Sequence, residues 1–174
     1  KKKIKKIKLK RKDKILCAKY RKGHFEGVLD IMDRLVMKIK PKYVFMGSKD
    51  FQQFYLVKNY IERKYECNVF ACKTIRNKNK LALSSRNFLL NKKDLYTAER
   101  LSIDLIKLKK KLANLINVKK FLNNNKITLS KKYNVNIEYL ELRNRKNLKE
   151  TNNIKFSNLF VAYYLKKIRL IDNF

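Results

Sequence analysis

The chain has 174 residues, of which 45% are hydrophobic and 11% aromatic, so it can bury a core and is not a wholly disordered protein. Its 46 Lys and Arg residues against 14 Asp and Glu give a formal net charge of +32. No apolar run is long enough to cross a bilayer and the basic N-terminus lacks the apolar stretch of a secretory signal, so we expect a soluble, intracellular protein of one ordinary domain or two small ones.

The first 14 residues are strongly basic. They hold nine lysines and Arg11 against Asp13, a net charge of +9. Ile4, Ile7 and Leu9 interrupt the charged run. A segment of this composition is typically a solvated tail, with a ragged edge strand as the alternative.

Helical periodicity begins at His24 and continues to Ile39. Its apolar residues recur at helical spacing and predict one buried face: Phe25, Val28, Leu29, Met32, Leu35, Val36 and Ile39. Pro41 stops this helix, because proline cannot continue one. The unbroken apolar run at 43–46, just before Gly47, then predicts a buried parallel strand.

A second helix is expected after Gly47, with Asp50 as its N-cap. Its core-facing residues are Phe51, Phe54, Tyr55, Val57 and Ile61. Residues 68–75 predict a second strand with Val69, Ala71 and Ile75 inside. Helix, strand, helix and strand in this order form a βαβ crossover, which implies a parallel sheet.

The character of the sequence changes at residue 76, so we place a domain boundary near residue 75. Helices followed by an antiparallel meander are expected beyond it, which makes a second, α+β unit. In chain order, these elements are a polar loop at 76–80, a long helix at 92–116 capped by Asn91, a short helix at 119–124, a strand at 135–142, and a hairpin of 159–165 and 168–171 around Lys166-Lys167.

The segment Gly47-Ser48-Lys49-Asp50 connects the first predicted strand to the following helix. Open α/β sheets bind ligands at the carboxyl ends of their strands. Exposed amides and the positive end of a helix dipole favour phosphate there, and Lys49 adds a point charge. An ordinary turn is the alternative, because a lone glycine and lysine are a weak signal.

Two further polar groups are candidates for ligand binding. Leu83-Ser84-Ser85-Arg86 lies in a loop before a helix, where two hydroxyls and a guanidinium suit the oxygens of a phosphate. Helix capping by serine is the equal alternative. Gln53 lies at the start of a predicted helix and can both donate and accept, as a ligand with hydroxyls and a carboxylate requires. Surface solvation is the alternative for Gln53.

His24 is the only histidine and stands in the segment Arg21-Lys22-Gly23-His24-Phe25. It would titrate or bond to a ligand near neutral pH, although a lone histidine is more often structural. Cys17, Cys67 and Cys72 have neither zinc-site nor disulfide spacing, and we interpret them as core or half-buried thiols. No cluster of His, Cys and carboxylates has the spacing of a metal site, so no metal ligands are predicted.

Three of these segments together resemble the pantothenate synthetase family: Arg21-Lys22-Gly23-His24-Phe25-Glu26-Gly27-Val28, Gly47-Ser48-Lys49-Asp50-Phe51-Gln52-Gln53 and Leu81-Ala82-Leu83-Ser84-Ser85-Arg86-Asn87. The C-terminal Arg169-Leu170-Ile171-Asp172-Asn173 is similar to that family's closing strand. The resemblance runs from about residue 15 to the end, and it implies an α/β fold. Residues 1–75 would be the C-terminal half of a Rossmann-like nucleotidyltransferase domain, and residues 76–174 a small α+β lid domain.

The resemblance also implies an activity. The family condenses pantoate with β-alanine, using ATP and Mg²⁺, through a pantoyl adenylate that β-alanine converts to pantothenate. It is cytoplasmic and usually homodimeric. We therefore expect small-molecule substrates, a homodimer, no specific nucleic acid and no membrane partner.

Individual roles follow from the resemblance by position. Residues that would bind ATP are Gly47, Ser48, Lys49, Asp50, Ile75, Leu83, Ser84, Ser85 and Arg86. Among them, Lys49, Ser84, Ser85 and Arg86 would carry catalysis, since in-line nucleotidyl transfer depends on positioned charge. Ile75 would contact the nucleotide through its backbone, and residues 83–86 would form a mobile phosphate-binding loop. Gln53 would bind pantoate, and Arg21 and His24 would lie near the same cleft.

Some positions depart from the family's pattern. Ser48 replaces an acidic residue, Lys22 a proline, and Asn79-Lys80 an Asp-Gly pair; the loss of glycine at position 80 should stiffen the loop. The family's His-x-Gly-His motif and a further Gln for pantoate are absent from the sequence. We therefore expect these 174 residues alone to be inactive, as a fragment of a longer protein, half of a split enzyme or a decayed remnant.

Two rival functions stay open. The net charge of +32 suits a protein that binds nucleic acid or another polyanion. However, the basic residues are mostly Lys, are spread over the whole chain and accompany many Asn and Ile, which is the bias of an AT-rich genome. The second rival is an adenylate-forming nucleotidyltransferase with a different acid or amine, because only the resemblance favours pantoate.

Overall fold

The computed structural model describes residues 7–174, which form two compact units divided between Lys73 and Thr74. The first unit (residues 7–73) is built on a parallel two-stranded sheet, and the second unit (residues 74–174) on an antiparallel three-stranded sheet. The predicted α/β class is confirmed.

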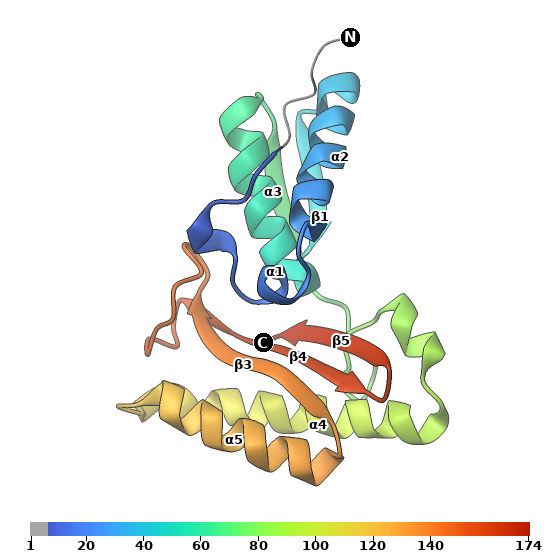
Figure 1. Cartoon of the computed structure of the whole chain (residues 1–174), viewed down its shortest axis with the longest axis vertical. Coiled ribbons are helices and arrows are strands. Elements are labelled where there is room, and N and C mark those ends of the chain that lie inside the picture. The colour runs from blue at the N-terminus through green and yellow to red at the C-terminus, as the bar shows by residue number, and fades with distance from the viewer. Residues whose placement is uncertain (1–6) are drawn as a thin grey trace. The chain divides into compact units, whose positions relative to one another are not determined.

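The first unit has the predicted order of helix, strand, helix and strand (Figure 1). Its two strands run parallel in a register from Tyr43↔Asn68 to Gly47↔Cys72, so the βαβ crossover is confirmed. The elements are η1 (Arg11–Asp13), α1 (Cys17–Tyr20), α2 (His24–Ile39), β1 (Tyr43–Gly47), η2 (Ser48–Asp50), α3 (Phe51–Lys64) and β2 (Asn68–Cys72).

The buried face of α2 is narrower than its sequence pattern predicts. Phe25, Leu29 and Val36 are buried, but Leu35 is 46% exposed and Ile39 is 65% exposed. Leu35 lies about 100° around the helix from Val36. The apolar stripe of α2 is therefore wider than the core that receives it.

The sheet of the first unit is covered on one face only. Tyr43 and Phe45 of β1 are exposed, so the prediction of a buried strand is wrong for that face. Val69 is buried, because successive side chains of a strand point to opposite faces and its face packs against the helices. The second strand stops before Ile75, and Ala71 and Ile75 are exposed rather than inside.

The basic segment contains no strand in its described part. Residues 7–14 are irregular apart from the turn η1, so a strand through Ile7 and Leu9 is not formed. Ile4, which the edge-strand alternative also includes, lies outside the described residues.

Two of the three cysteines are buried as predicted. Cys17 and Cys67 lie in the core. Cys72 at the end of β2 is exposed, so the prediction of a core or half-buried thiol is wrong for this residue.

In the second unit, α4 and α5 lie beside each other across one face of the three-stranded sheet (Figure 1). The strand order is β3-β4-β5, and the β4–β5 pair is the predicted hairpin, with Lys166 in the turn at φ 52. The elements are η3 (Ser85–Leu89), α4 (Lys92–Lys111), η4 (Leu112–Asn114), α5 (Val118–Tyr133), β3 (Asn136–Asn144), β4 (Ser157–Leu165) and β5 (Ile168–Asn173).

The helices of the second unit differ from prediction in length. α4 is capped by Asn91 as expected, through a 2.8 Å bond from the Asp94 backbone N–H, but it ends at Lys111. α5 is much longer than predicted, since Leu122 and Leu129 continue one buried stripe through an asparagine-rich segment of low helix propensity. No helix within residues 7–174 is both long and apolar enough to cross a membrane.

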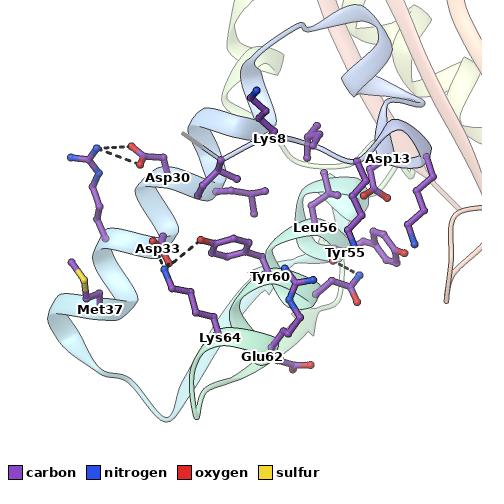
Figure 2. A pocket seen from close by; sticks show the side chains of 18 residues that line it. Lys8, Asp13, Asp30, Asp33, Met37, Tyr55, Leu56, Tyr60, Glu62 and Lys64 are labelled. Atoms are coloured by element: carbon purple, nitrogen blue, oxygen red, sulfur yellow. Dashed lines mark hydrogen bonds and ion pairs between the residues drawn. The ribbon is translucent and has the colours of Figure 1, made fainter. Parts of the chain in front are cut away.

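A half-buried ion pair joins α2 to the end of α3. Lys64 Nζ lies 2.7 and 2.8 Å from the two carboxylate oxygens of Asp33 (Figure 2). The Tyr65 hydroxyl donates to Asp33 Oδ1 at 2.8 Å. Burial opposes ionisation of Asp33, but the bonds from Lys64 and Tyr65 outweigh it and hold the pKa of this carboxyl below its ordinary value.

The substitution Asp33→Asn should therefore make the stability of the chain less dependent on pH. A carboxylate whose pKa is lowered by folding stabilises the native state above the unfolded pKa and loses this effect as the pH falls through the folded pKa. We expect wild type to lose on the order of 1 kcal/mol more unfolding free energy than Asp33→Asn between pH 6 and pH 3. Urea unfolding followed by circular dichroism measures this difference. Asp30→Asn, which removes the exposed pair with Arg34 on the same helix, is the matched control, and equal pH dependence in wild type and Asp33→Asn would contradict the account.

Candidate functional site

The topology of the first unit gathers its predicted site residues at one end. α2 leads directly into β1 and α3 leads directly out of it, so both helices run antiparallel to the strand and begin near its carboxyl end. Figure 1 shows α1 at this end of α2 and α3. Arg21, His24, the segment 47–50 and Gln53 therefore belong to the same edge of the first unit.

The segment Gly47–Asp50 turns from β1 into α3. Gly47 has an ordinary φ of −65, and a Cβ at this position would meet nothing within 4 Å, so the described chain leaves open space beside it. Lys49 Nζ lies 3.8 Å from Asp50 Oδ2, and the Lys49 side chain is only 18% exposed. Asp50 precedes α3 but its side chain makes no capping bond, so its predicted capping role is wrong. The N-terminus of α3 nevertheless carries the partial positive charge of the helix dipole, which favours an anion.

Gln52 is a structural residue that the sequence did not reveal. Its side chain is buried, and its Nε2 donates to the carbonyls of Asp13 at 3.1 Å and Ile15 at 2.8 Å. Its Oε1 accepts from the Ala18 N–H at 3.3 Å. Gln52 thus fixes the chain before α2 to the N-terminal end of α3. The available signal was helical spacing, because Gln52 lies one turn before buried Leu56.

Gln53, the adjacent residue, has the opposite environment. It is half-buried, and its amide makes no side-chain hydrogen bond to any residue in the range 7–174. Both donors and the acceptor of Gln53 are consequently available to a ligand.

Arg21 and His24 flank the turn between α1 and α2. The His24 backbone N–H donates to the Arg21 carbonyl at 3.2 Å, and Gly23 between them adopts φ 77, a left-handed conformation that favours glycine. The His24 ring packs 4.9 Å from the Phe25 ring, centroid to centroid. Both side chains stand at the beginning of α2 and so at the edge of the first unit described above.

In the second unit, the loop after Ile75 is held by buried polar groups. Asn77 Nδ2 donates to Glu99 Oε1 at 2.6 Å, and Asn79 Nδ2 donates to Glu99 Oε2 at 2.7 Å. Glu99 is 8% exposed on α4. Ile75 itself is 71% exposed, and its carbonyl accepts the Leu83 N–H at 2.9 Å. This backbone hydrogen bond joins Ile75 to Leu83, and both residues are predicted to contact the nucleotide.

Arg76 clamps the same loop onto β5. Its two terminal nitrogens donate to Asp172 at 2.7 and 2.9 Å, and one also donates to the Asn173 carbonyl at 3.0 Å. Its guanidinium carbon lies 4.6 Å from the centroid of the Phe174 ring. No sequence signal distinguishes Arg76 from the other basic residues, so this anchor was missed.

Ser84, Ser85 and Arg86 lie at the beginning of η3. Ser84 is the N-cap, and its Oγ accepts from the Arg86 N–H at 3.3 Å, so the alternative of helix capping by serine is confirmed for Ser84. Ser85 is exposed, and its hydroxyl makes no hydrogen bond to any described residue from 7 to 174. Arg86 Nη1 donates to the Arg169 carbonyl at 2.9 Å, which fixes the guanidinium against β5 and leaves its remaining donors for a ligand.

The predicted site residues thus form two groups. Arg21, His24, Gly47–Asp50 and Gln53 come together in the first unit, and Ile75 and 83–86 come together in the second. Within residues 7–174, no group of three or more His, Cys, Asp or Glu side chains is arranged to hold a metal ion.

A groove on the first unit lies away from these residues. It has a volume of about 1120 Å³ and lies between residues 7–13, α2 and α3 (Figure 2). None of the predicted site residues lines it, and several of its charges are paired with one another, including Asp33 with Lys64 and Asp30 with Arg34. We therefore place the candidate site at the strand end and not in this groove.

Comparison with known proteins gives one consistent family. A protein-family model described as Pantoate-beta-alanine ligase matches residues 2–174. A pantothenate synthetase from Campylobacter hominis is 38% identical over 164 residues, which covers 91% of this chain and 58% of that protein.

Solved structures agree with the fold. A pantothenate synthetase from Thermus thermophilus is similar with a TM-score of 0.82 at 22% identity, over 98% of this chain and 63% of that one. A pantoate-beta-alanine ligase from Francisella tularensis, solved in complex with beta-gamma ATP and beta-alanine, is similar with a TM-score of 0.76 at 28% identity, over 98% of this chain and 58% of that one. The chain thus spans less than two thirds of the length of each relative.

The loop of the second unit carries a strained lysine that suggests a direct test. Lys80 adopts φ 70, where a side chain is disfavoured, and its backbone bonds to Asn77 and Arg76 need no side chain. Lys80→Gly should raise the unfolding free energy by about 0.5–1 kcal/mol, since relief of strain exceeds the added entropy of the unfolded chain. Thermal unfolding checks this, with Lys78→Gly in the same loop as control. No gain, or an equal gain in the control, would show that the conformation at Lys80 is not strained.

Proposed function

The chain belongs to the pantoate–β-alanine ligase family, and from this membership we propose that it contributes to the ATP-dependent condensation of pantoate with β-alanine. The observation that carries the proposal is the strand end at Gly47–Asp50, where open space beside Gly47, the N-terminus of α3 and the Lys49 ammonium occur together. This combination suits the phosphates of a nucleotide.

The proposed reaction has two steps. A pantoate carboxylate oxygen attacks the α-phosphorus of ATP, the new O–P bond forms, and the bond to pyrophosphate breaks. The amine of β-alanine then attacks the acyl carbon of pantoyl adenylate, loses a proton and displaces AMP. Both steps accumulate negative charge on phosphate oxygens, so the protein accelerates them chiefly by position and charge.

We assign phosphate contacts in the first unit to the backbone of Gly47 and Ser48 and to Lys49, with Asp50 beside them. The partial positive charge of the α3 N-terminus and the Lys49 ammonium would stabilise the charge that develops on the α-phosphate. Gln53 is assigned to pantoate, because its amide is available and complements hydroxyl and carboxylate groups. Arg21 and His24, at the same edge of the first unit, are assigned to the substrate cleft.

The loop of the second unit is assigned a phosphate-binding role as well. Ser85 and the remaining donors of Arg86 are available, while Ser84 offers its hydroxyl from the N-cap. Ile75 and Leu83 would contact the nucleotide through their backbones. The anchors at Glu99 and Arg76 support this assignment, since they hold the loop's base while its outer residues stay exposed.

Magnesium enters this proposal as part of the substrate, MgATP. Mg²⁺ commonly binds through nucleotide phosphates and water with few protein ligands. The donor set of residues 7–174 fits that mode, because it offers single carboxylates such as Asp50 and no cage. A cytoplasmic location and a homodimer belong to the same proposal and rest on the resemblance.

The test is pantoate-dependent release of pyrophosphate from ATP by the polypeptide purified as its own cells make it. We expect release that requires pantoate and AMP formation that requires β-alanine. Lys49→Ala should lower the rate by about 10²- to 10³-fold, whereas Lys38→Ala at the distal end of α2 should leave it unchanged. Pyrophosphate release that does not depend on pantoate, or full activity of Lys49→Ala, would contradict the proposal. If the chain instead bound random DNA with a steep dependence on salt, a polyanion-binding protein would be favoured.

A further inference from the structure

The groove between residues 7–13, α2 and α3 is used by neither group of candidate site residues (Figure 2). Its volume of about 1120 Å³ exceeds the range of ordinary small-molecule pockets, which is about 300–1,000 Å³, so it has room for an extended ligand. Its lining carries more basic than acidic side chains. The basic ones are Lys8, Lys10, Lys12, Arg34, Arg63 and Lys64, and the acidic ones are Asp13, Asp30, Asp33 and Glu62.

Most of the acidic charge in this groove is neutralised by the protein itself. Three of the four carboxylates form ion pairs with basic side chains of α2 or α3. The pairs are Asp33 with Lys64, Asp30 with Arg34, and Glu62 with Lys58. The carboxylates of the groove therefore oppose the approach of an anion only weakly.

Four cations of the lining remain available to a ligand. Within residues 7–174, the side chains of Lys8, Lys10, Lys12 and Arg63 take part in no ion pair and no hydrogen bond, and all four are exposed. Three of them lie on the N-terminal segment and Arg63 lies on α3. The groove is thus bordered on two sides by positive charge, which attracts an anionic chain lying between them.

The alternation of the basic segment explains how its lysines come to border the groove. Ile7 and Leu9 are half-buried and line the groove, whereas Lys8 and Lys10 are exposed. The apolar residues hold the segment against the first unit, and the lysines between them follow the groove in contact with water. The sequence that precedes this segment is basic as well, because five of its six residues are lysine.

Two aromatic side chains complete the lining. Tyr55 and Tyr60 project from α3 and are half-buried (Figure 2). Grooves that combine cations with aromatic rings bind single-stranded nucleic acid, since the cations follow the phosphates and the rings stack on the bases. Stacking requires unpaired bases, so this combination favours a single strand over a duplex.

We infer that the groove between residues 7–13, α2 and α3 binds single-stranded nucleic acid without sequence preference, through its four available cations and the rings of Tyr55 and Tyr60. The net charge of +32 does not carry this inference by itself, because it is spread over the whole chain. The paired carboxylates, the cations on two sides and the aromatic lining carry it. The inference does not depend on the proposed activity, since strand binding and pyrophosphate release are separate measurements.

The experiment follows the anisotropy of a fluorescent oligo(dT) of about 12 nucleotides, between about 50 and 200 mM KCl. Removal of two groove cations, in the double variant Lys10→Ala/Arg63→Ala, should weaken binding by about tenfold. It should also reduce the slope of log K against log salt concentration by about 1.4, because each phosphate contact on a single strand contributes about 0.7. Thermal unfolding of the variant establishes that it is folded.

The matched control is Arg100→Ala/Lys110→Ala. It removes the same two side chains from exposed positions of α4, which does not line the groove. Affinity and salt slope of this control should equal those of wild type. Equal effects of the two double variants would overturn the inference, because they would show that the oligonucleotide responds to net charge and not to the groove.

The aromatic contribution has a different signature. Tyr60→Leu should weaken binding by about fivefold or more and leave the salt slope unchanged, since it removes a stacking ring and no charge. Tyr60→Phe keeps the ring and should bind as wild type does. Wild-type affinity of Tyr60→Leu, or equal affinity of the wild-type chain for a duplex of the same length, would overturn the assignment to a single strand.

Discussion

The parallel pairing of β1 with β2 is the constraint on which the chemistry of the first unit depends. Parallel strands need a crossover, and here the crossover is α3, which begins where β1 ends. The helix N-terminus, Lys49 and Gln53 are therefore delivered to the carboxyl edge of the sheet by the path of the chain. A one-residue slip of β2 against β1 would turn the side chains of β2 to the opposite face, burying Phe70 and exposing Val69.

Buried polar side chains then hold the segments that regular hydrogen bonding leaves loose. Gln52 joins three backbone groups before α2 to the beginning of α3. Glu99 receives two asparagine amides of the 76–82 loop, and the Arg76–Asp172 pair fastens that loop to β5. Each anchor lies beside residues whose polar groups remain available, which is how a rigid support can present a few polar groups to a ligand.

The sequence predicted the order and type of most elements, because α2, α3 and the β4–β5 hairpin have clear periodicity. It could not predict which apolar faces are covered, since the spacing of Leu35, Ile39 and Ala71 reports apolarity and not the presence of a neighbour. α5 was predicted too short, because tertiary packing of Leu122 and Leu129 overrides weak local propensity. The segments of the candidate site were found through their joint order. The anchors of these segments, Gln52, Glu99 and Arg76, were not found. A single amide, carboxylate or guanidinium gives no sign in the sequence of whether it will be buried or solvated.

The central claim is that the carboxyl end of β1 holds the phosphates of ATP. Its most direct test is a titration of the isotopically labelled chain with MgATP, followed by backbone amide chemical shifts in NMR at constant ionic strength. The account predicts the largest saturable shifts at residues 47–50 and Gln53, where α3 begins and where the Gln53 amide makes no side-chain hydrogen bond to a described residue. Shifts confined to the groove lined by residues 7–13 and α2, or spread without saturation over the surface lysines, would contradict it.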